Sequence, residues 1–191
     1  MSEGEINGIS EIRVDDKAVT FSGAMADNTQ RTVASNDANF FKADPNDENS
    51  SAESLITIEP HFGTDGQSAS SLLSTLSNWT SNHKLSGLSY LALRFTWNQD
   101  AFSSIPKVQA KVQGKKIVTL DASLNESSAT YSTNPAFCIL DYLRNERYGK
   151  GIATADIDLQ SFRDASQVCI TQVTPYSGSS DINIFDTNAV L

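Results

Sequence analysis

The segment YLALRFTW, residues 90–97, carries the clearest secondary-structure signal in the chain. Its larger apolar side chains lie at every second position, at Leu91, Leu93, Phe95 and Trp97. The positions between them are Tyr90, Ala92, Arg94 and Thr96. A period of two over the whole segment is typical of a β-strand and does not fit a helix. The pattern therefore predicts a strand that buries its apolar face, including Trp97, in the core.

Short strands are also predicted before this segment. In residues 5–21, apolar and polar residues alternate on both sides of Asp15-Asp16-Lys17. Such short runs around an Asp-rich turn predict a hairpin. Residues 55–58 predict a further short strand, which Pro60 and Gly63 end.

The stretch after residue 97 predicts another hairpin. Residues 107–113 alternate Val or Ala with Lys or Gln, which is typical of a half-buried strand with one basic face. Gly114-Lys115 then turns the chain into residues 116–119. A basic face suits an acidic partner, and lysine also protects an open sheet edge. The lysines of this region are Lys107, Lys111, Lys115 and Lys116.

Two other regions of the first half have different patterns. Residues 34–54 are polar and contain Pro45, which predicts a long loop or insertion. Residues 68–80 place their apolar side chains at helical spacing, which predicts a short amphipathic helix. Those side chains are Leu72, Leu73, Leu76 and Trp79.

The C-terminal half is predicted to be helical. Asn134 is a capping residue directly before Pro135, a residue favoured at the first helical position. Apolar residues follow at helical spacing, and Gly149 supplies the stop. A second helix begins near Asp158 and fades near Gln172.

These elements predict the fold class. We expect a final strand in residues 182–190. The order predicts an α+β fold, mainly antiparallel β-hairpins with two to three short helices in the middle and C-terminal half. We expect a single domain over residues 1–191, strand-rich in residues 1–130 and helical in residues 134–173.

The composition excludes several classes of function. The chain has 191 residues, with 14 Lys and Arg against 23 Asp and Glu, and a net charge of −9. An acidic chain is a poor ligand for nucleic acid and for an anionic membrane surface. The chain has no apolar run of the length that a membrane span needs, about 18 residues or more. Its first residues are too acidic for a signal peptide.

Few residues suit catalysis or metal binding. Neither His61 nor His83 has a second histidine three or four residues away, so a zinc-helix motif is not present. Cys138 and Cys169 lack metal-ligand spacing and are interpreted as buried thiols. We find no phosphate loop and no nucleophile elbow. The residues alone therefore predict a non-enzymatic protein that works by contact and uses no cofactor and no metal.

Several motifs resemble a known family. Residues 131–151 read YSTNPAFCILDYLRNERYGKG, residues 155–158 read ADID, and QVC follows at residues 167–169. In these motifs the chain resembles the tail-tip attachment proteins of long-tailed bacteriophages, also called host-specificity or central tail-hub proteins. Further stretches match in the same order: SEGEINGI (2–9), WTSNH (79–83), GLSYLALR (87–94), IP to GKKI (105–117) and NAV (188–190).

The resemblance implies roles for particular residues. Asn134 and Pro135 would start a helix, and Tyr148 would anchor its end beside a left-handed stop at Gly149. These residues would define the fold and would not be catalytic. The fold-defining or interface candidates are Asn134, Pro135, Tyr148, Gly149, Trp79 and Trp97.

The resemblance also implies a place in the virion. It implies a structural part of a trimeric hub that closes the tail tube at the tail tip, made in the host cytoplasm. Its partners would be other tail-tip proteins and copies of itself, with no nucleic acid and no membrane span. Proteins of this family are several times longer, so we expect an excised domain. Binding of the host surface receptor would then belong to distal regions that this chain lacks.

Two alternatives remain open from the residues. One is a carbohydrate-binding β-rich adhesion module that uses exposed aromatic side chains, with Trp79, Tyr90 and Trp97 as the candidates. The other is a wall-degrading hydrolase, for which the nearest acid and base residues are Glu59, His61 and Asp65.

Overall fold

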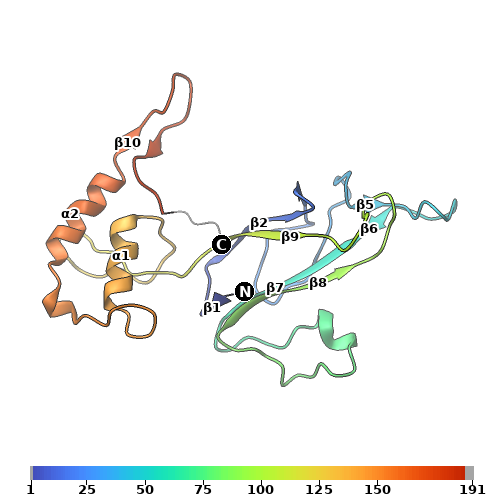
Figure 1. Ribbon diagram of the computed structural model, residues 1–191, viewed down its shortest axis with the longest axis horizontal. Helices are drawn as coiled ribbons and strands as arrows, with labels where there is room; N and C mark the ends of the chain where they lie inside the picture. The colour runs from blue at the N-terminus through green and yellow to red at the C-terminus, as the bar shows by residue number, and fades with distance from the viewer. Residues whose placement is uncertain (1, 188–191) are drawn as a thin grey trace. The chain divides into compact units, whose positions relative to one another are not determined.

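The computed structural model describes residues 2–187. The chain divides into two compact units, unit 1 (Met1–Lys115) and unit 2 (Lys116–Leu191). The regular secondary structure of unit 1 is almost entirely β-strand, and the two α-helices found in the described residues belong to unit 2 (Figure 1). This order of mainly antiparallel strands before helices confirms the predicted α+β class.

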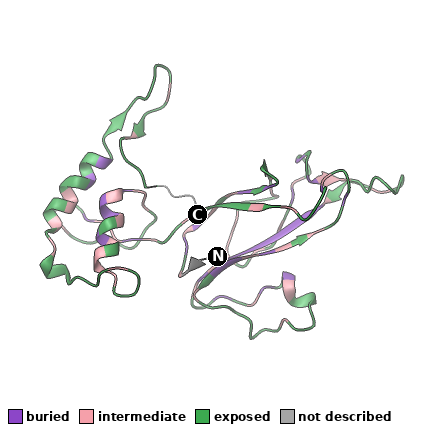
Figure 2. Ribbon diagram, viewed as in Figure 1, coloured by how far each residue is buried: buried purple, intermediate pink, exposed green. Residues whose placement is uncertain are grey.

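The largest sheet of unit 1 has four antiparallel strands. Their order is β1 (Ser2–Glu3), β8 (Leu88–Phe95), β7 (Ile56–Phe62) and β4 (Arg31–Thr32). β7 pairs with β8 over its whole length, from Ile56 opposite Phe95 to Phe62 opposite Ser89. Buried residues concentrate along β7 (Figure 2), which makes it the central strand of this unit.

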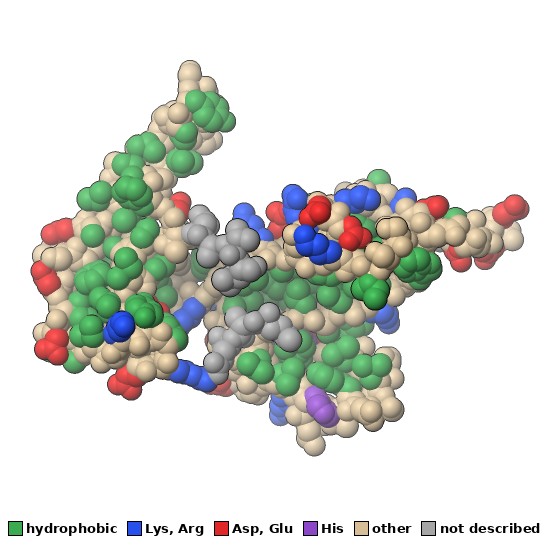
Figure 3. Space-filling model, in the orientation of Figure 1, with side chains coloured by type: hydrophobic (Ala, Val, Ile, Leu, Met, Phe, Trp, Pro, Cys, Tyr) green, Lys and Arg blue, Asp and Glu red, His purple; other side chains and the backbone are tan. Residues whose placement is uncertain are grey.

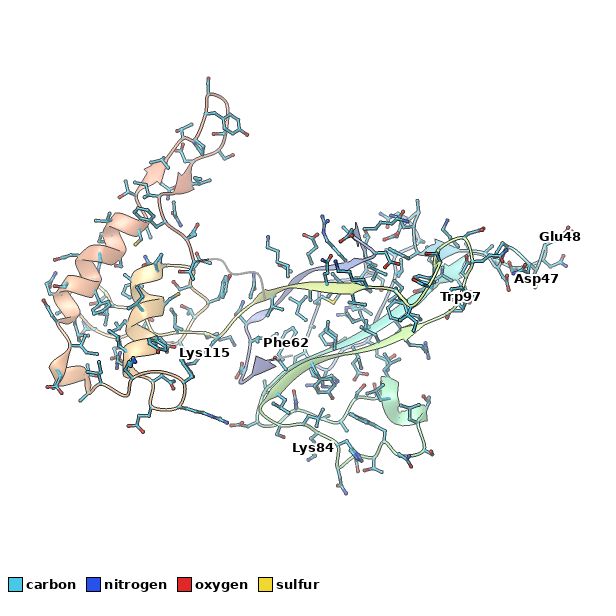
Figure 4. All side chains as sticks on the ribbon, viewed as in Figure 1. Asp47, Glu48, Phe62, Lys84, Trp97 and Lys115 are labelled. Atoms are coloured by element: carbon cyan, nitrogen blue, oxygen red, sulfur yellow. The ribbon has the colours of Figure 1, made fainter. Side chains whose placement is uncertain are left out.

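The predicted burial of Trp97 is wrong. β8 ends at Phe95, and the Trp97 side chain, labelled in Figure 4, is 64% exposed. The next residue, Asn98, is buried instead, and its Nδ2 donates to the carbonyl of Ala43 at 2.9 Å. This hydrogen bond draws the chain out of the sheet. The period of two that grouped Trp97 with Leu91 therefore no longer applies beyond Phe95.

β7 is longer than predicted, because Pro60 lies inside the strand and does not end it. The Pro60 carbonyl accepts a hydrogen bond from Asn28 N at 2.8 Å, on the side of the strand away from β8. The N–H and C=O of one strand residue point to the same side. The N–H that Pro60 lacks would have pointed away from β8, so the β7–β8 ladder is intact.

A second sheet of unit 1 has three antiparallel strands, β3 (Lys17–Ala18), β2 (Gly8–Val14) and β9 (Val108–Gln113), in that order. The first predicted hairpin is present as β2 and β3, and its turn residues Asp15 and Asp16 have φ of 49° and 63°. The second predicted hairpin is wrong. β9 pairs with β2, whereas residues 116–119 open unit 2, where Ile117 bridges Thr130.

Side chains from both sheets form one apolar core in unit 1. Its buried members are Ile12, Val14, Val33, Phe40, Leu55, Ile56, Ile58 and Phe102. Phe40 comes from the predicted loop of residues 34–54, which contains a short antiparallel pair, β5 (Phe41–Lys42) with β6 (Glu53–Ser54). Asp47 and Glu48 lie at the exposed tip between these strands (Figure 4). The predicted loop is thus anchored at its base and polar at its tip.

The helix predicted over residues 68–80 is wrong. Its helical part is one 3₁₀ turn, η1 (Leu72–Thr75), and Leu76 follows in an extended conformation, 56% exposed. The backbone N–H of Leu72 donates to the carboxylate of Glu59 on β7 at 2.7 Å. A side chain of the sheet therefore holds this segment, so that it needs no long helix of its own.

Unit 2 contains α1 (Pro135–Arg144), η2 (Thr154–Asp156), α2 (Leu159–Cys169), β10 (Gln172–Val173) and β11 (Ile182–Asn183). Its core residues are Ile117, Leu120, Phe137 and Leu140. β11 is shorter than the final strand predicted over residues 182–190, of which residues 188–190 lie outside the described part. No helix within residues 2–187 has the length and apolar character needed to cross a membrane.

Candidate assembly surface

Asn134 starts α1 as predicted and also ties the two α-helices together. Its Oδ1 accepts from the N–H of Ala136 at 3.1 Å, and Pro135 is the first helical residue. Its Nδ2 donates to the carbonyl of Ser166 on α2 at 3.0 Å. Asn134 is only 8% exposed and lies inside unit 2.

The predicted helix stop at Gly149 is wrong. α1 ends at Arg144, and the Asn145 side chain then accepts from the N–H of Tyr148 at 3.1 Å. The left-handed conformation belongs to Gly151, with φ of 62°. Gly149 is needed for a different reason, since a Cβ there would lie 1.7 Å from the carbonyl oxygen of Tyr142.

Two of the predicted aromatic candidates differ in exposure. Tyr148 is 48% exposed, and its hydroxyl donates to the carboxylate of Asp141. Trp79 is half-buried, and its ring stacks on the exposed His83 at a centroid distance of 5.1 Å. Trp97 and Tyr148 therefore remain available for contact, and Trp79 is partly covered by its own loop.

A buried polar cluster lies on β7. It contains Glu59 and His61, the acid and base candidates of the hydrolase alternative. Burial alone would raise the pKa of Glu59, but hydrogen bonds from Leu72, Ser71 and Ser70 outweigh it, and this pKa lies below its usual value. Burial lowers the pKa of His61, and the nearby Glu59 offsets only part of this effect. The pair therefore consists of an ionised carboxylate and a neutral imidazole near neutral pH.

The geometry of this cluster differs from that of a catalytic triad. His61 Nε2 lies 3.4 Å from Glu59 Oε1, and Ser70 Oγ donates directly to Glu59 Oε2 at 2.9 Å. In a triad the histidine lies between the serine and the acid. His61 is 0% exposed, whereas Asp65 is exposed to solvent. The cluster therefore holds the segment that contains η1 on the sheet.

Tyr90 belongs to the same cluster, which corrects its prediction as an exposed sugar-binding side chain. Its ring stacks on His61 at a centroid distance of 4.2 Å, and the residue is 6% exposed. Within residues 2–187, no three His, Cys, Asp or Glu side chains are grouped as metal ligands.

The most exposed apolar surface of unit 2 follows its second helix. We call residues 168–185 the arm: they comprise the end of α2, β10, a loop and β11, and read VCITQVTPYSGSSDINIF. Val173 pairs with Ile182, and Ile184 N donates to the carbonyl of Thr171 at 2.9 Å. The arm is anchored at its base, where Thr133 Oγ1 donates to Asp186 at 2.7 Å.

The arm presents large apolar side chains to solvent. Figure 3 shows them gathered over α2 and the β10–β11 hairpin, and they are Val168, Ile170, Val173, Tyr176, Ile182, Ile184 and Phe185. Tyr176 is 72% exposed and Phe185 is 54% exposed. Asp181 is the one charged side chain in the arm. Apolar, charge-poor surfaces of this kind mark protein–protein contacts.

The sequence contains a signal for the arm in its charge pattern. A stretch with one charge, together with Ile, Val, Tyr and Phe, stands out in a chain in which 19% of residues are charged. The pattern predicts burial of these side chains, and the structure shows that the chain itself does not bury them. The arm is therefore the candidate assembly surface.

Comparison with known proteins gives this surface a context. No protein-family model matches the chain. The chain is 36% identical over 84 residues to the baseplate hub protein pb3 of Escherichia phage T5. The similarity supports a phage tail or baseplate family. The matched region is 44% of this chain and 8% of the phage T5 protein, so the chain spans a small part of this hub relative.

Proposed function

We propose that this chain is a structural module of a phage tail-tip or baseplate hub and that it catalyses no reaction. The observation that carries the proposal is the 36% identity with the phage T5 baseplate hub protein. The arm supports it, because a module that works by contact needs an apolar surface that its own fold leaves open.

The proposal extends to assembly and location. Both units act as one hub module over residues 1–191, as part of a longer tail protein. The module is made in the host cytoplasm and incorporated at the tail tip, where it contacts other tail proteins and copies of itself in a trimer. Contact with the host receptor belongs to regions outside this chain.

The buried cluster on β7 supports the non-catalytic part of the proposal. Its acid and base are enclosed, and the carboxylate is occupied by the N–H groups of Ser71 and Leu72 and by the hydroxyl of Ser70. A substrate would have to displace these hydrogen bonds and the segment that makes them.

Immunogold electron microscopy of the phage that carries this sequence tests the location. Antibodies raised against the chain are applied to intact particles and to tails dissociated with mild denaturant, which exposes buried epitopes. We expect gold at the tail end in at least the dissociated sample. Label absent from both samples, with an antibody that recognises the chain on a blot, would contradict a place in the tail.

A further inference from the structure

The β9 strand has one open edge. In the three-stranded sheet it pairs with β2 alone. The carbonyl of Lys107 accepts from the N–H of Asp15 at 2.9 Å, and that of Gln113 accepts from the N–H of Asn7 at 3.0 Å. Both carbonyls therefore point toward the β2 side. Because strand residues alternate in direction, the backbone groups of Val108, Ala110 and Val112 point the other way. No strand within residues 2–187 pairs with that side.

This edge is also the part of unit 1 with the most basic sequence. Residues 107–115 contain three lysines and no acidic residue, in a chain of net charge −9. Lys107 lies 3.9 Å from Asp16 but remains largely exposed. The strand has an apolar contribution as well, since Val112 is 48% exposed. A partner for this edge should therefore be an extended segment with apolar side chains and negative charge.

The arm has these properties. Residues 168–187 contain two carboxylates, Asp181 and Asp186, and no lysine or arginine. β10 and β11 form a sheet of only two strands, with Ile182 52% exposed. A two-stranded hairpin is marginally stable in water and gains from a third strand.

We propose that the arm of one copy of this chain docks on the β9 edge of a second copy. The β9 strand of the second copy then becomes a third strand beside β10–β11. This inference rests on the proposed function, because it names the partner of the assembly surface. The contact is heterologous, since the two surfaces differ. Repetition of such a contact produces a ring when the rotation between neighbouring copies closes, and a ring is the assembly that the proposed hub requires.

Photo-crosslinking between isotopically distinct copies tests the contact. Ile182 is replaced by benzoyl-phenylalanine in unlabelled chain, which is mixed with ¹⁵N-labelled wild-type chain and irradiated. We expect crosslinked peptides that join position 182 of the unlabelled chain to residues 107–113 of the labelled chain. Crosslinks confined to one copy, crosslinks to the tip at Asp47 and Glu48, or no crosslinks at all would overturn the proposal.

An edge-blocking variant tests the same contact by affinity. Ala110→Pro removes an outward N–H, a change that an open sheet edge tolerates. Analytical ultracentrifugation should show self-association weakened by about tenfold or more, from the lost hydrogen bond and the steric block. The matched control, Ile105→Ser, removes a 94% exposed apolar side chain just before β9 and should leave association unchanged. Equal effects of the two variants, with both folded by circular dichroism, would contradict the proposal.

The two proposals fail in different ways. If the arm binds another tail protein, the purified chain remains monomeric while gold still labels the tail, and this inference alone is overturned. If copies associate through β9 but neither intact nor dissociated tails are labelled, the location fails and the self-contact is supported.

Discussion

Two short segments of this chain have the same pattern and opposite surroundings. Residues 56–58 in β7 read Ile-Thr-Ile, and residues 182–184 in the arm read Ile-Asn-Ile. Ile56 and Ile58 are 0% exposed, whereas Ile182 is 52% and Ile184 is 38% exposed. β7 lies between two other strands, and its side chains pack in a core formed by two sheets. In the arm, two strands of two residues each pair with one another. The same local pattern is buried only where the rest of the chain covers it.

The largest expected effect comes from matched truncations of these two segments. Ile58→Ala leaves a cavity in the core and should lower the free energy of unfolding by about 2–5 kcal/mol. Ile182→Ala removes exposed atoms and should change it by no more than about 0.5 kcal/mol. Denaturant unfolding followed by tryptophan fluorescence and circular dichroism measures both. Similar losses in the two variants would show that the arm is buried in the isolated chain.

A second substitution tests how the sheet holds η1. Glu59→Gln keeps the side-chain size but turns an amide toward donors, and should lower the free energy of unfolding by about 1–3 kcal/mol. The control is Glu53→Gln on β6, where the side chain is exposed. Thermal unfolding of both variants gives the comparison. An unfolding temperature of Glu59→Gln that matches the control would refute the anchoring role of this carboxylate.

Gly149→Ala tests the close approach at the end of α1. The added Cβ would meet the carbonyl of Tyr142 at 1.7 Å, so the turn must shift. We expect unit 2 to lose about 1–3 kcal/mol of stability, which is typical of overpacking. Gly178→Ala is a useful contrast, because no atom lies near its Cβ but its φ is +86° and strain alone applies. Hydrogen exchange in residues 135–150 should rise only in Gly149→Ala. Unchanged exchange there would contradict the close contact.

The smallest expected effect is a pH dependence from the buried histidine. The pKa of His61 is lowered in the folded chain, so the unfolded chain binds more protons as pH falls below its ordinary value of about 6.5. The contribution of His61 is therefore complete above that value and is lost as pH falls toward the folded pKa. Glu59 also has a lowered pKa, and its contribution is lost in a more acidic range, below its ordinary value of about 4.3.

His61→Phe keeps a ring against Tyr90 and removes the titration. Unfolding measured at intervals between about pH 7 and 5, the range in which an ordinary histidine titrates, should show a flatter profile than wild type. The acidic loss due to carboxylates should remain in both proteins. A wild-type profile that is already flat over this range would contradict the lowered pKa of His61.

The sequence predicted elements better than it predicted their partners. The alternation around residues 90–97 and the turn at Asp15-Asp16 are local, and both were found as strands and turn. The pairing of β9 with β2 joins residues about a hundred positions apart, so local periodicity could not select it over a hairpin with residues 116–119. Trp97 was misplaced for the same reason, since the hydrogen bond of Asn98 to Ala43 is non-local.

The candidate site was predicted in part. Asn134 was expected as a cap and has that role, but its bond to Ser166 depends on how α2 packs. Gly149 was expected to provide a left-handed stop, whereas its importance comes from the nearby Tyr142 carbonyl. The arm was missed because apolar alternation predicts burial and contains no information on whether the covering atoms belong to the same chain.

Cryo-electron microscopy of intact tails tests the central claim most directly, namely that this chain is a hub module whose arm is covered in the assembly. The account predicts both units at the tail end, with residues 168–185 in contact with a neighbouring chain. A tail end that lacks this fold, or that contains it with the arm exposed to solvent, would contradict the account.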